Sequence, residues 1–126
     1  MKILVAGATG FIGKKLVKKL DEKGHEIVVL TRNRETARFH IPIHCEIQQW
    51  DPEKSPLLTN SLKDIDVVIN LSGENIASSF WTETQKRKLM DSRKMSVRRI
   101  VKAMAVMNTK PKVFISASAV GFYGNR

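Results

Sequence analysis

Three glycines spaced three residues apart, Gly7, Gly10 and Gly13, have the clearest chemical meaning in this chain. One glycine lets the chain turn sharply after a strand, and a second lets the backbone approach a pyrophosphate that a side chain would hold away. A third allows a helix to pack closely on a sheet, and the N–H groups at the start of that helix attract phosphate. The spacing therefore predicts a phosphate-binding turn, with a purely structural turn as the alternative.

The segments on both sides of these glycines are the elements that must position them. A short apolar run at residues 3–6 is typical of a strand buried on both faces of a parallel sheet. From Phe11 the apolar residues recur at helical spacing, and Gly24 predicts the end of that helix. Residues 26–31 predict a second strand, so the three elements form a βαβ unit with a right-handed crossover.

Two arginines, Arg32 and Arg34, follow the second predicted strand. An NAD enzyme usually has an acidic residue at this point to bind the ribose 2′-hydroxyl, whereas an Arg accommodates the 2′-phosphate of NADP. No acidic residue stands between Val28 and Asn33. Both arginines are therefore candidate cofactor-binding residues, and the sequence favours NADP over NAD; a solvated basic loop is the alternative.

The rest of the chain predicts three further strands and a long helix. The predicted elements are a third strand within residues 39–49, a short helix at 57–62, a fourth strand at 66–71, a helix from Thr82 to about Met107, and a fifth strand at 112–116. Thr82 and Gln85 form a capping box for the long helix. The expected apolar line of that helix is Leu89, Val97, Ile100, Val101 and Met104.

Small and polar residues follow several of these predicted strands. Asp51 comes after the third strand, where it can accept a hydrogen bond from an adenine amino group or serve as a turn residue. Ser72 and Gly73 follow the fourth strand and would let a ligand approach closely, or form a bare turn. Because ligands bind outside the carboxyl ends of the strands in open α/β sheets, we expect these residues to lie near a common site.

Three stretches together resemble the extended and atypical short-chain dehydrogenase/reductases. They are residues 6–13, 70–75 and 116–124, and the match is closest to the NAD-dependent epimerase/dehydratase branch, also labelled nucleoside-diphosphate-sugar epimerase-like. The resemblance implies an α/β, three-layer Rossmann fold with about five parallel strands in the order 3-2-1-4-5 and helices on both faces. It matches only the amino-terminal part of a family member. We therefore expect residues 1–126 to be the NAD(P)-binding domain of a longer protein.

The same resemblance implies roles for the turn after the first strand. Its residues would line the pyrophosphate of the cofactor, and Arg32 would meet the 2′-phosphate. The turn residues concerned are Gly7, Thr9, Gly10, Phe11, Ile12 and Gly13. Leu71, Ser72 and Gly73 would pass beside the adenine-side ribose and phosphates.

The resemblance also implies a candidate active site after the fifth strand. Ser118 corresponds to the family's active-site Ser, ahead of Ser116, which is kept as a cofactor contact. Tyr123 belongs to a Tyr-Gly pair that shapes the substrate site and is not itself the proton-transfer Tyr. The family's Tyr-x-x-x-Lys pair does not occur within residues 1–126, because Tyr123 is the only Tyr and the sequence ends before the position four residues later.

These observations predict an NADP-binding domain of an epimerase-like oxidoreductase that acts on a nucleotide sugar or a similar small molecule. We expect the chain alone to bind NADP with little or no turnover, so dehydrogenase activity of residues 1–126 would refute this expectation. The missing pair favours the alternative of a non-catalytic NADP sensor or interaction module. Nucleic-acid binding is a weaker alternative, because the basic residues lack interleaved aromatics.

Composition limits the remaining possibilities. Twenty-two Lys and Arg against 12 Asp and Glu give a net charge of +10, which favours anionic partners. The single Cys45 excludes an internal disulfide and a multi-cysteine zinc site, and we expect no metal site. With no signal peptide and no run of about 20 apolar residues, we expect a cytoplasmic chain without a membrane span. A homo-oligomer could form through an exposed sheet edge or through helix packing.

Overall fold

The computed structural model describes residues 1–71 and 83–116, and for residues 83–93 it describes the backbone. Its elements are β1 (Lys2–Ala6), α1 (Phe11–Glu22), β2 (Glu26–Thr31), α2 (Arg34–His40), β3 (Glu46–Gln49), the 3-10 helix η1 (Thr59–Leu62), β4 (Val67–Asn70), α3 (Glu83–Ala105) and β5 (Val113–Ser116). The strands form one parallel sheet in the order β3-β2-β1-β4-β5. The predicted fold and strand order are confirmed.

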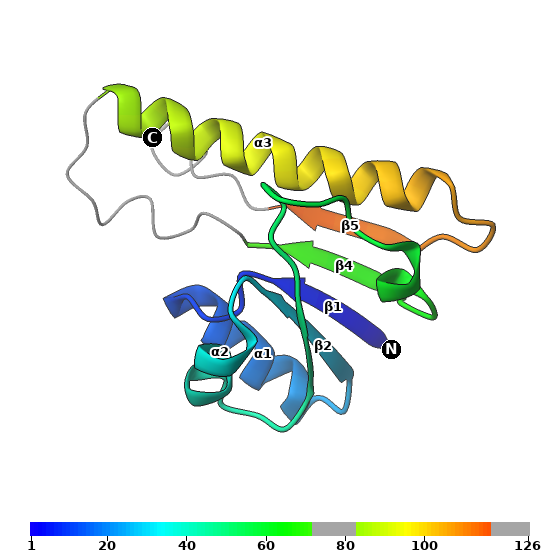
Figure 1. Cartoon of the computed structure of the whole chain (residues 1–126). Helices are drawn as coiled ribbons and strands as arrows, with labels where there is room; N and C mark the ends of the chain where they lie inside the picture. Colours follow the sequence, from blue (N-terminus) through cyan, green and yellow to red (C-terminus); the bar gives the residue numbers. More distant parts are fainter. Residues whose placement is uncertain (72–82, 117–126) are drawn as a thin grey trace, which may run out of the picture.

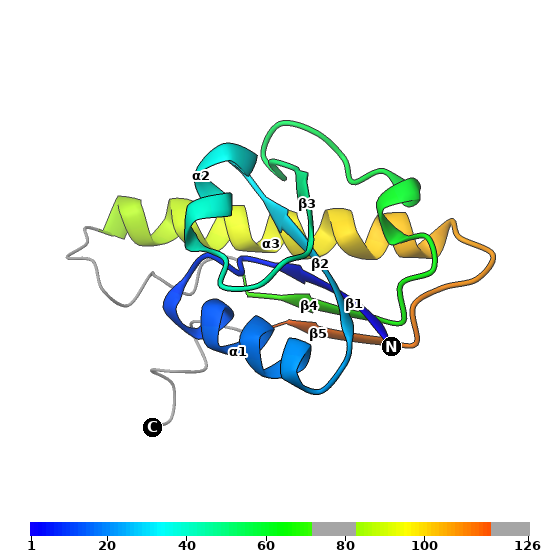
Figure 2. The same ribbon diagram turned by 90° about the horizontal axis from the view of Figure 1, so that it is seen from below.

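The sheet forms the middle of three layers, with α1 and α3 on opposite faces (Figures 1 and 2). Alternate residues of each central strand enter different apolar clusters, because successive side chains of a strand point to opposite faces. Leu4 and Val28 join the cluster that contains Ile100 of α3. Ile3 and Val5 join the cluster with α1 and α2. Both faces of β1 are buried, which explains why its sequence is continuously apolar.

Gly24 ends α1 as predicted, one position after the C-cap Lys23. Its φ of +87° lies in the left-handed region that favours glycine. The Gly24 N–H donates to the Asp21 carbonyl at 2.9 Å, and the His25 N–H donates to the Leu20 carbonyl at 3.2 Å. These two bonds form a Schellman motif that satisfies carbonyl groups at the helix end and turns the chain into β2.

The third strand is shorter than predicted, and a helix precedes it. Residues 39–45 are not strand: α2 runs to His40, and β3 begins only at Glu46. Asn33 starts the helix, because its side chain accepts hydrogen bonds from the Glu35 and Thr36 N–H groups, both at 3.1 Å. Ile41, Ile43 and Cys45 instead belong to the connection between α2 and β3, and they pack with the cluster that contains residues of α1 and α2.

Within its described side chains, α3 buries part of the predicted apolar line: Ile100 is fully buried, and Met104 packs against the same cluster. Ser96, Ile100 and Ala103 are buried, at the spacing of one helix face. Val101, expected to be part of the apolar line, is 47% exposed, so that part of the prediction was wrong. The predicted cap residue Thr82 lies outside the described residues, and the helix ends at Ala105.

A buried hydrogen bond joins α3 to the end of β4. The Asn70 side-chain amide donates to the Ser96 hydroxyl at 3.1 Å, and both residues are buried. Replacing Ser96 with alanine is expected to lower the free energy of unfolding by about 1–2 kcal/mol, because the buried amide loses this acceptor. Urea unfolding measures the loss. Ser55→Ala, at an exposed position, is the matched control, and equal losses in the two variants would contradict the prediction.

Candidate functional site

The strand register brings the carboxyl ends of all five strands to one edge of the sheet. Ala6 is paired with Leu30 on one side and with Asn70 on the other, and Asn70 is paired in turn with Ser116. Thr31 is paired with Gln49 at the end of β3. The predicted turn, Arg32, Asp51, Leu71 and Ser116 therefore all lie at this edge, where open α/β sheets bind their ligands.

The glycine turn between β1 and α1 has two positions that require glycine. Gly7 has a φ of +85°, in the left-handed region. At Gly13, an added Cβ would stand 2.6 Å from both the Ala8 Cα and the Gly7 carbonyl oxygen. The first turn of α1 therefore packs directly against the backbone of the preceding turn. Gly10, the buried N-cap residue between them, donates its N–H to the Gly7 carbonyl at 3.4 Å.

The N-terminus of α1 is suited to bind an anion. Across residues 7–14, all of which the structure describes, no side chain caps the helix, and its first turn contains no acidic residue. The first N–H groups of a helix and the positive end of its dipole favour a phosphate at such a position. Phe11 and Ile12 are exposed beside this terminus, with the Lys15 Nζ 4.4 Å from the centre of the Phe11 ring, and Thr9 is half-buried.

Arg32 lies directly after β2 and contacts two carboxylates. Its Nη2 is 3.4 Å from the Glu53 Oε2, and its Nε is 3.9 Å from the Asp51 Oδ1. The Asp51 Oδ1 also accepts the Glu53 N–H at 2.9 Å, so Asp51 serves as a turn residue. Its predicted contact with adenine stays a prediction. The Arg32 side chain is 56% exposed, which leaves the guanidinium accessible from solvent.

Arg34 is the first residue of α2 and not part of a loop. Its backbone N–H donates to the Gln49 Oε1 at 3.3 Å, so the start of α2 is bonded to the end of β3. The Asn33 N–H, one residue earlier, donates to the Thr31 hydroxyl at 3.3 Å. These bonds fix the backbone on both sides of Arg32.

Four predicted site residues lie outside the described residues: Ser72, Gly73, Ser118 and Tyr123. Leu71 is buried, and its N–H donates to the Ala6 carbonyl at 2.7 Å beside the glycine turn. Ser116 is exposed at the end of β5. The sequence did not identify Glu53 as part of this site. The only indication was that it is acidic and stands two positions after Asp51.

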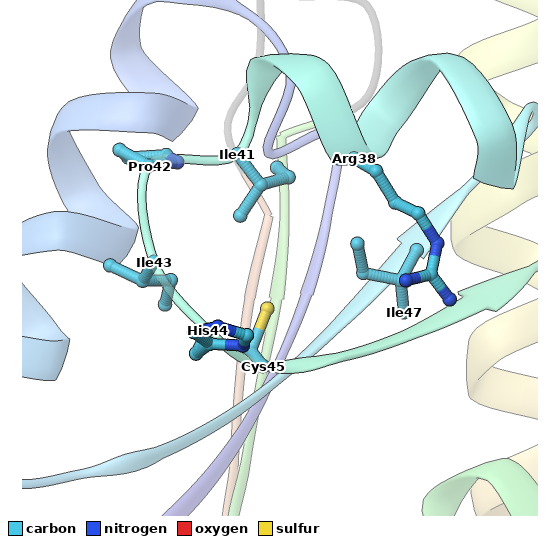
Figure 3. Close-up of a pocket in the computed structure, with 7 residues that line it drawn as sticks. All are labelled: Arg38, Ile41, Pro42, Ile43, His44, Cys45 and Ile47. Atoms are coloured by element: carbon cyan, nitrogen blue, oxygen red, sulfur yellow. The ribbon is translucent and has the colours of Figure 1, made fainter.

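A cavity of about 380 Å³ lies between α2 and the chain that leads into β3 (Figure 3). It is lined by Arg38, Ile41, Pro42, Ile43, His44, Cys45 and Ile47. Burial raises the pKa of the Cys45 thiol, and the nearby carboxylates of Asp21 and Glu46 raise it further. The thiol therefore stays protonated at neutral pH and is a poor nucleophile.

Among the described side chains, those of residues 1–71 and 94–116, no three His, Cys, Asp or Glu are grouped so that they could hold a metal ion. No helix in the described part of the chain combines the length and the apolar character that a membrane crossing needs.

Comparison with known proteins gives a consistent family match. The model of the NAD dependent epimerase/dehydratase family matches residues 3–126. The chain is 38% identical over 125 residues to the epimerase family protein YfhF of Bacillus subtilis, covering 98% of this chain and 39% of YfhF. It is 34% identical over 123 residues to the epimerase family protein ML0860 of Mycobacterium leprae, covering 98% of this chain and 37% of that protein.

A solved structure agrees with the sequence match. The crystal structure of human epimerase family protein SDR39U1 (isoform 2) with NADPH superposes with a TM-score of 0.71 at 29% identity. The superposition covers 98% of this chain and 38% of the human chain. The chain therefore spans less than two fifths of the length of these three relatives.

Proposed function

Because the chain belongs to the NAD-dependent epimerase/dehydratase family, we propose that it forms the NADP-binding domain of a short-chain oxidoreductase. The longer protein would act on a nucleotide sugar or a similar small molecule. The observation that carries this proposal is the position of Arg32, directly after β2 and at the same sheet edge as the glycine turn. The single cysteine is compatible with a reducing compartment, and we propose a cytoplasmic location.

The glycine turn supports binding of the pyrophosphate. A positive φ at Gly7 and the close backbone contact at Gly13 shape the turn, and no side chain caps the start of α1 that follows it. The uncapped start of α1 would bind phosphate oxygens beside Thr9, Gly10, Phe11 and Ile12. The nicotinamide supplies hydride transfer when bound, and the residues of this chain bind and orient the dinucleotide.

The end of β2 supports NADP over NAD. A guanidinium stands where an NAD-specific site would carry an acidic residue, and it is accessible from solvent. Arg34 follows at the start of α2 and adds positive charge. We propose that Asp51 accepts a hydrogen bond from the adenine amino group. The human relative's structure contains NADPH, which agrees with this choice.

The remaining assignments concern the ends of β4 and β5. We propose that Leu71, Ser72 and Gly73 line the adenine-side ribose and phosphates, since Leu71 is bonded to the end of β1. Ser116 would contact the cofactor from the end of β5. In the longer protein, Ser118 would act at the active site and Tyr123 would shape the substrate site.

Replacing Arg32 with alanine tests the proposal. NADPH affinity is expected to fall roughly tenfold to a hundredfold, because a charge-assisted contact to the 2′-phosphate is lost. NADH affinity is expected to change by less than about twofold, because NADH lacks that phosphate. Isothermal titration calorimetry with each dinucleotide measures both affinities.

The control is Arg38→Ala, an exposed Arg on α2 that lines the separate cavity. It removes the same charge and should leave both affinities unchanged. Equal weakening of NADPH and NADH by Arg32→Ala would show that Arg32 supports the fold and does not bind the 2′-phosphate. Absence of binding of either dinucleotide by the wild-type chain would overturn the proposed function.

A further inference from the structure

The Arg32 guanidinium contacts two carboxylates of this chain, those of Asp51 and Glu53. Glu53 approaches it from the loop after β3, at 3.4 Å from Nη2. On this basis, and resting on the proposed function, we infer that Glu53 lowers the preference for NADP over NAD that Arg32 provides. Its carboxylate competes with the 2′-phosphate for Arg32, so the residue weakens NADPH binding and leaves NADH binding largely unaffected.

The position of Glu53 is fixed by the loop that carries it. Trp50 is buried, its N–H donates to the Thr31 carbonyl at 2.8 Å, and its indole N–H donates to the Ser55 carbonyl at 3.0 Å. The Asp51 carbonyl accepts the Lys54 N–H at 3.0 Å. The loop is thus anchored on β2 next to Arg32, and the contact with Glu53 is a consequence of the fold.

The two carboxylates near Arg32 have different roles. Asp51 accepts the Glu53 N–H through the oxygen that also faces Arg32, so its removal would disturb the turn itself. Among the hydrogen bonds within this loop, those of Glu53 involve its backbone, while its carboxylate is directed to Arg32. A substitution of the Glu53 carboxylate therefore changes the charge beside Arg32 and keeps the bonds of the turn.

The expected change in NADPH affinity on removing the Glu53 carboxylate follows from the exposure of the two side chains. The Glu53 and Arg32 side chains are both more than half exposed, and exposed ion pairs are weak because solvent screens them. A 2′-phosphate carries roughly two negative charges, so it can displace the Glu53 carboxylate from the guanidinium. Glu53 is also a fixed negative charge beside that phosphate. Its removal should therefore strengthen NADPH binding moderately and should not create binding where none existed.

The test is the NADPH and NADH affinity of Glu53→Gln, measured by isothermal titration calorimetry beside the wild-type chain. NADPH affinity is expected to rise about threefold to tenfold, and NADH affinity to change by less than about twofold. Glu53→Asp keeps the charge on a shorter side chain and should lie closer to wild type. The control is Glu22→Gln, which makes the same change in net charge on an exposed residue at the far end of α1. It should leave both affinities unchanged.

Other results for the NADPH affinity would contradict the role inferred for Glu53. Unchanged NADPH affinity in Glu53→Gln, with wild-type NADPH binding intact, would overturn this inference and leave the proposed function standing. Weaker NADPH binding would also overturn it, because Glu53 would then orient Arg32 instead of competing for it. An equal rise in Glu22→Gln would assign the effect to net charge alone. A wild-type chain that binds neither dinucleotide would overturn the proposed function and this inference together.

Discussion

Replacing Gly13 with alanine is expected to lower the free energy of unfolding by about 2–3 kcal/mol, as overpacking at a close-packed site does. The new Cβ would stand 2.6 Å from the Ala8 Cα and the Gly7 carbonyl oxygen, and 2.9 Å from the Ala8 carbonyl carbon. All three are backbone atoms, so no side-chain rotation relieves the overlap. The first turn of α1 must move away from the glycine turn.

That displacement should also affect the proposed cofactor site. The helix N-terminus and the turn would no longer present their N–H groups to one phosphate, so NADPH affinity is expected to fall at least about tenfold. Urea unfolding and calorimetric titration measure the two effects. Gly24→Ala is the control: it introduces strain at a φ of +87°, but no atom lies within 4 Å of the added Cβ.

Gly24→Ala is expected to cost about 1–2 kcal/mol of stability through backbone strain and to leave the NADPH affinity of the folded chain unchanged. If Gly13→Ala bound NADPH as tightly as Gly24→Ala, the close contact at Gly13 would have no part in phosphate binding.

The second large effect concerns the centre of the sheet. Leu4→Ala is expected to lower the free energy of unfolding by about 3–5 kcal/mol, the cost of a cavity at a site that cannot collapse. Leu4 is fully buried in β1, paired with Val28 and Val68 on its two sides. Its cluster includes Ile100 of α3, so the cavity would open between sheet and helix.

A domain of this size is usually stable by only about 5–15 kcal/mol, so Leu4→Ala should unfold at a clearly lower urea concentration or temperature. Leu58→Ala removes the same atoms from a side chain that is 70% exposed, and it is expected to change stability by less than about 0.5 kcal/mol. Similar losses in the two variants would contradict the description of Leu4 as a core residue.

The first half of the fold could be predicted from sequence because its signals are local and strong. The apolar run of β1, the glycine turn and the end of α1 at Gly24 each depend on residues close together in the chain. The strand order followed from the family resemblance, since pairing between β1 and β4 joins residues more than sixty positions apart.

The elements that were missed have weak or misleading patterns. α2 buries only Ala37 among its residues, so it has no apolar stripe, and its signal was the single cap residue Asn33. Ile41, Ile43 and Ile47 alternate like a strand, yet Pro42 interrupts them and Ile41 caps the helix. Val101 was assigned to the core by spacing, but the face of α3 that meets the sheet is set by Ser96 and Ile100.

In the candidate site, too, only the features with a local sequence signal could be predicted. Arg32 could be identified because its meaning depends on its place after β2. The contact with Glu53 could not, because it depends on the parallel pairing of β2 with β3 and on the turn formed by Asp51. No local pattern encodes a contact between residues twenty-one positions apart.

The burial of Trp50 in the loop that carries Glu53 gives the protein an intrinsic optical probe. Trp50 is 8% exposed and its indole N–H donates to the Ser55 carbonyl, so its fluorescence depends on the packing of this loop. A reduced nicotinamide absorbs light where indole emits, so a bound NADPH should quench Trp50 by energy transfer. The chain has one other tryptophan, Trp81, and a Trp81→Phe background would isolate the signal. Occupancy of the site and movement of the loop could then be followed in real time without an attached dye.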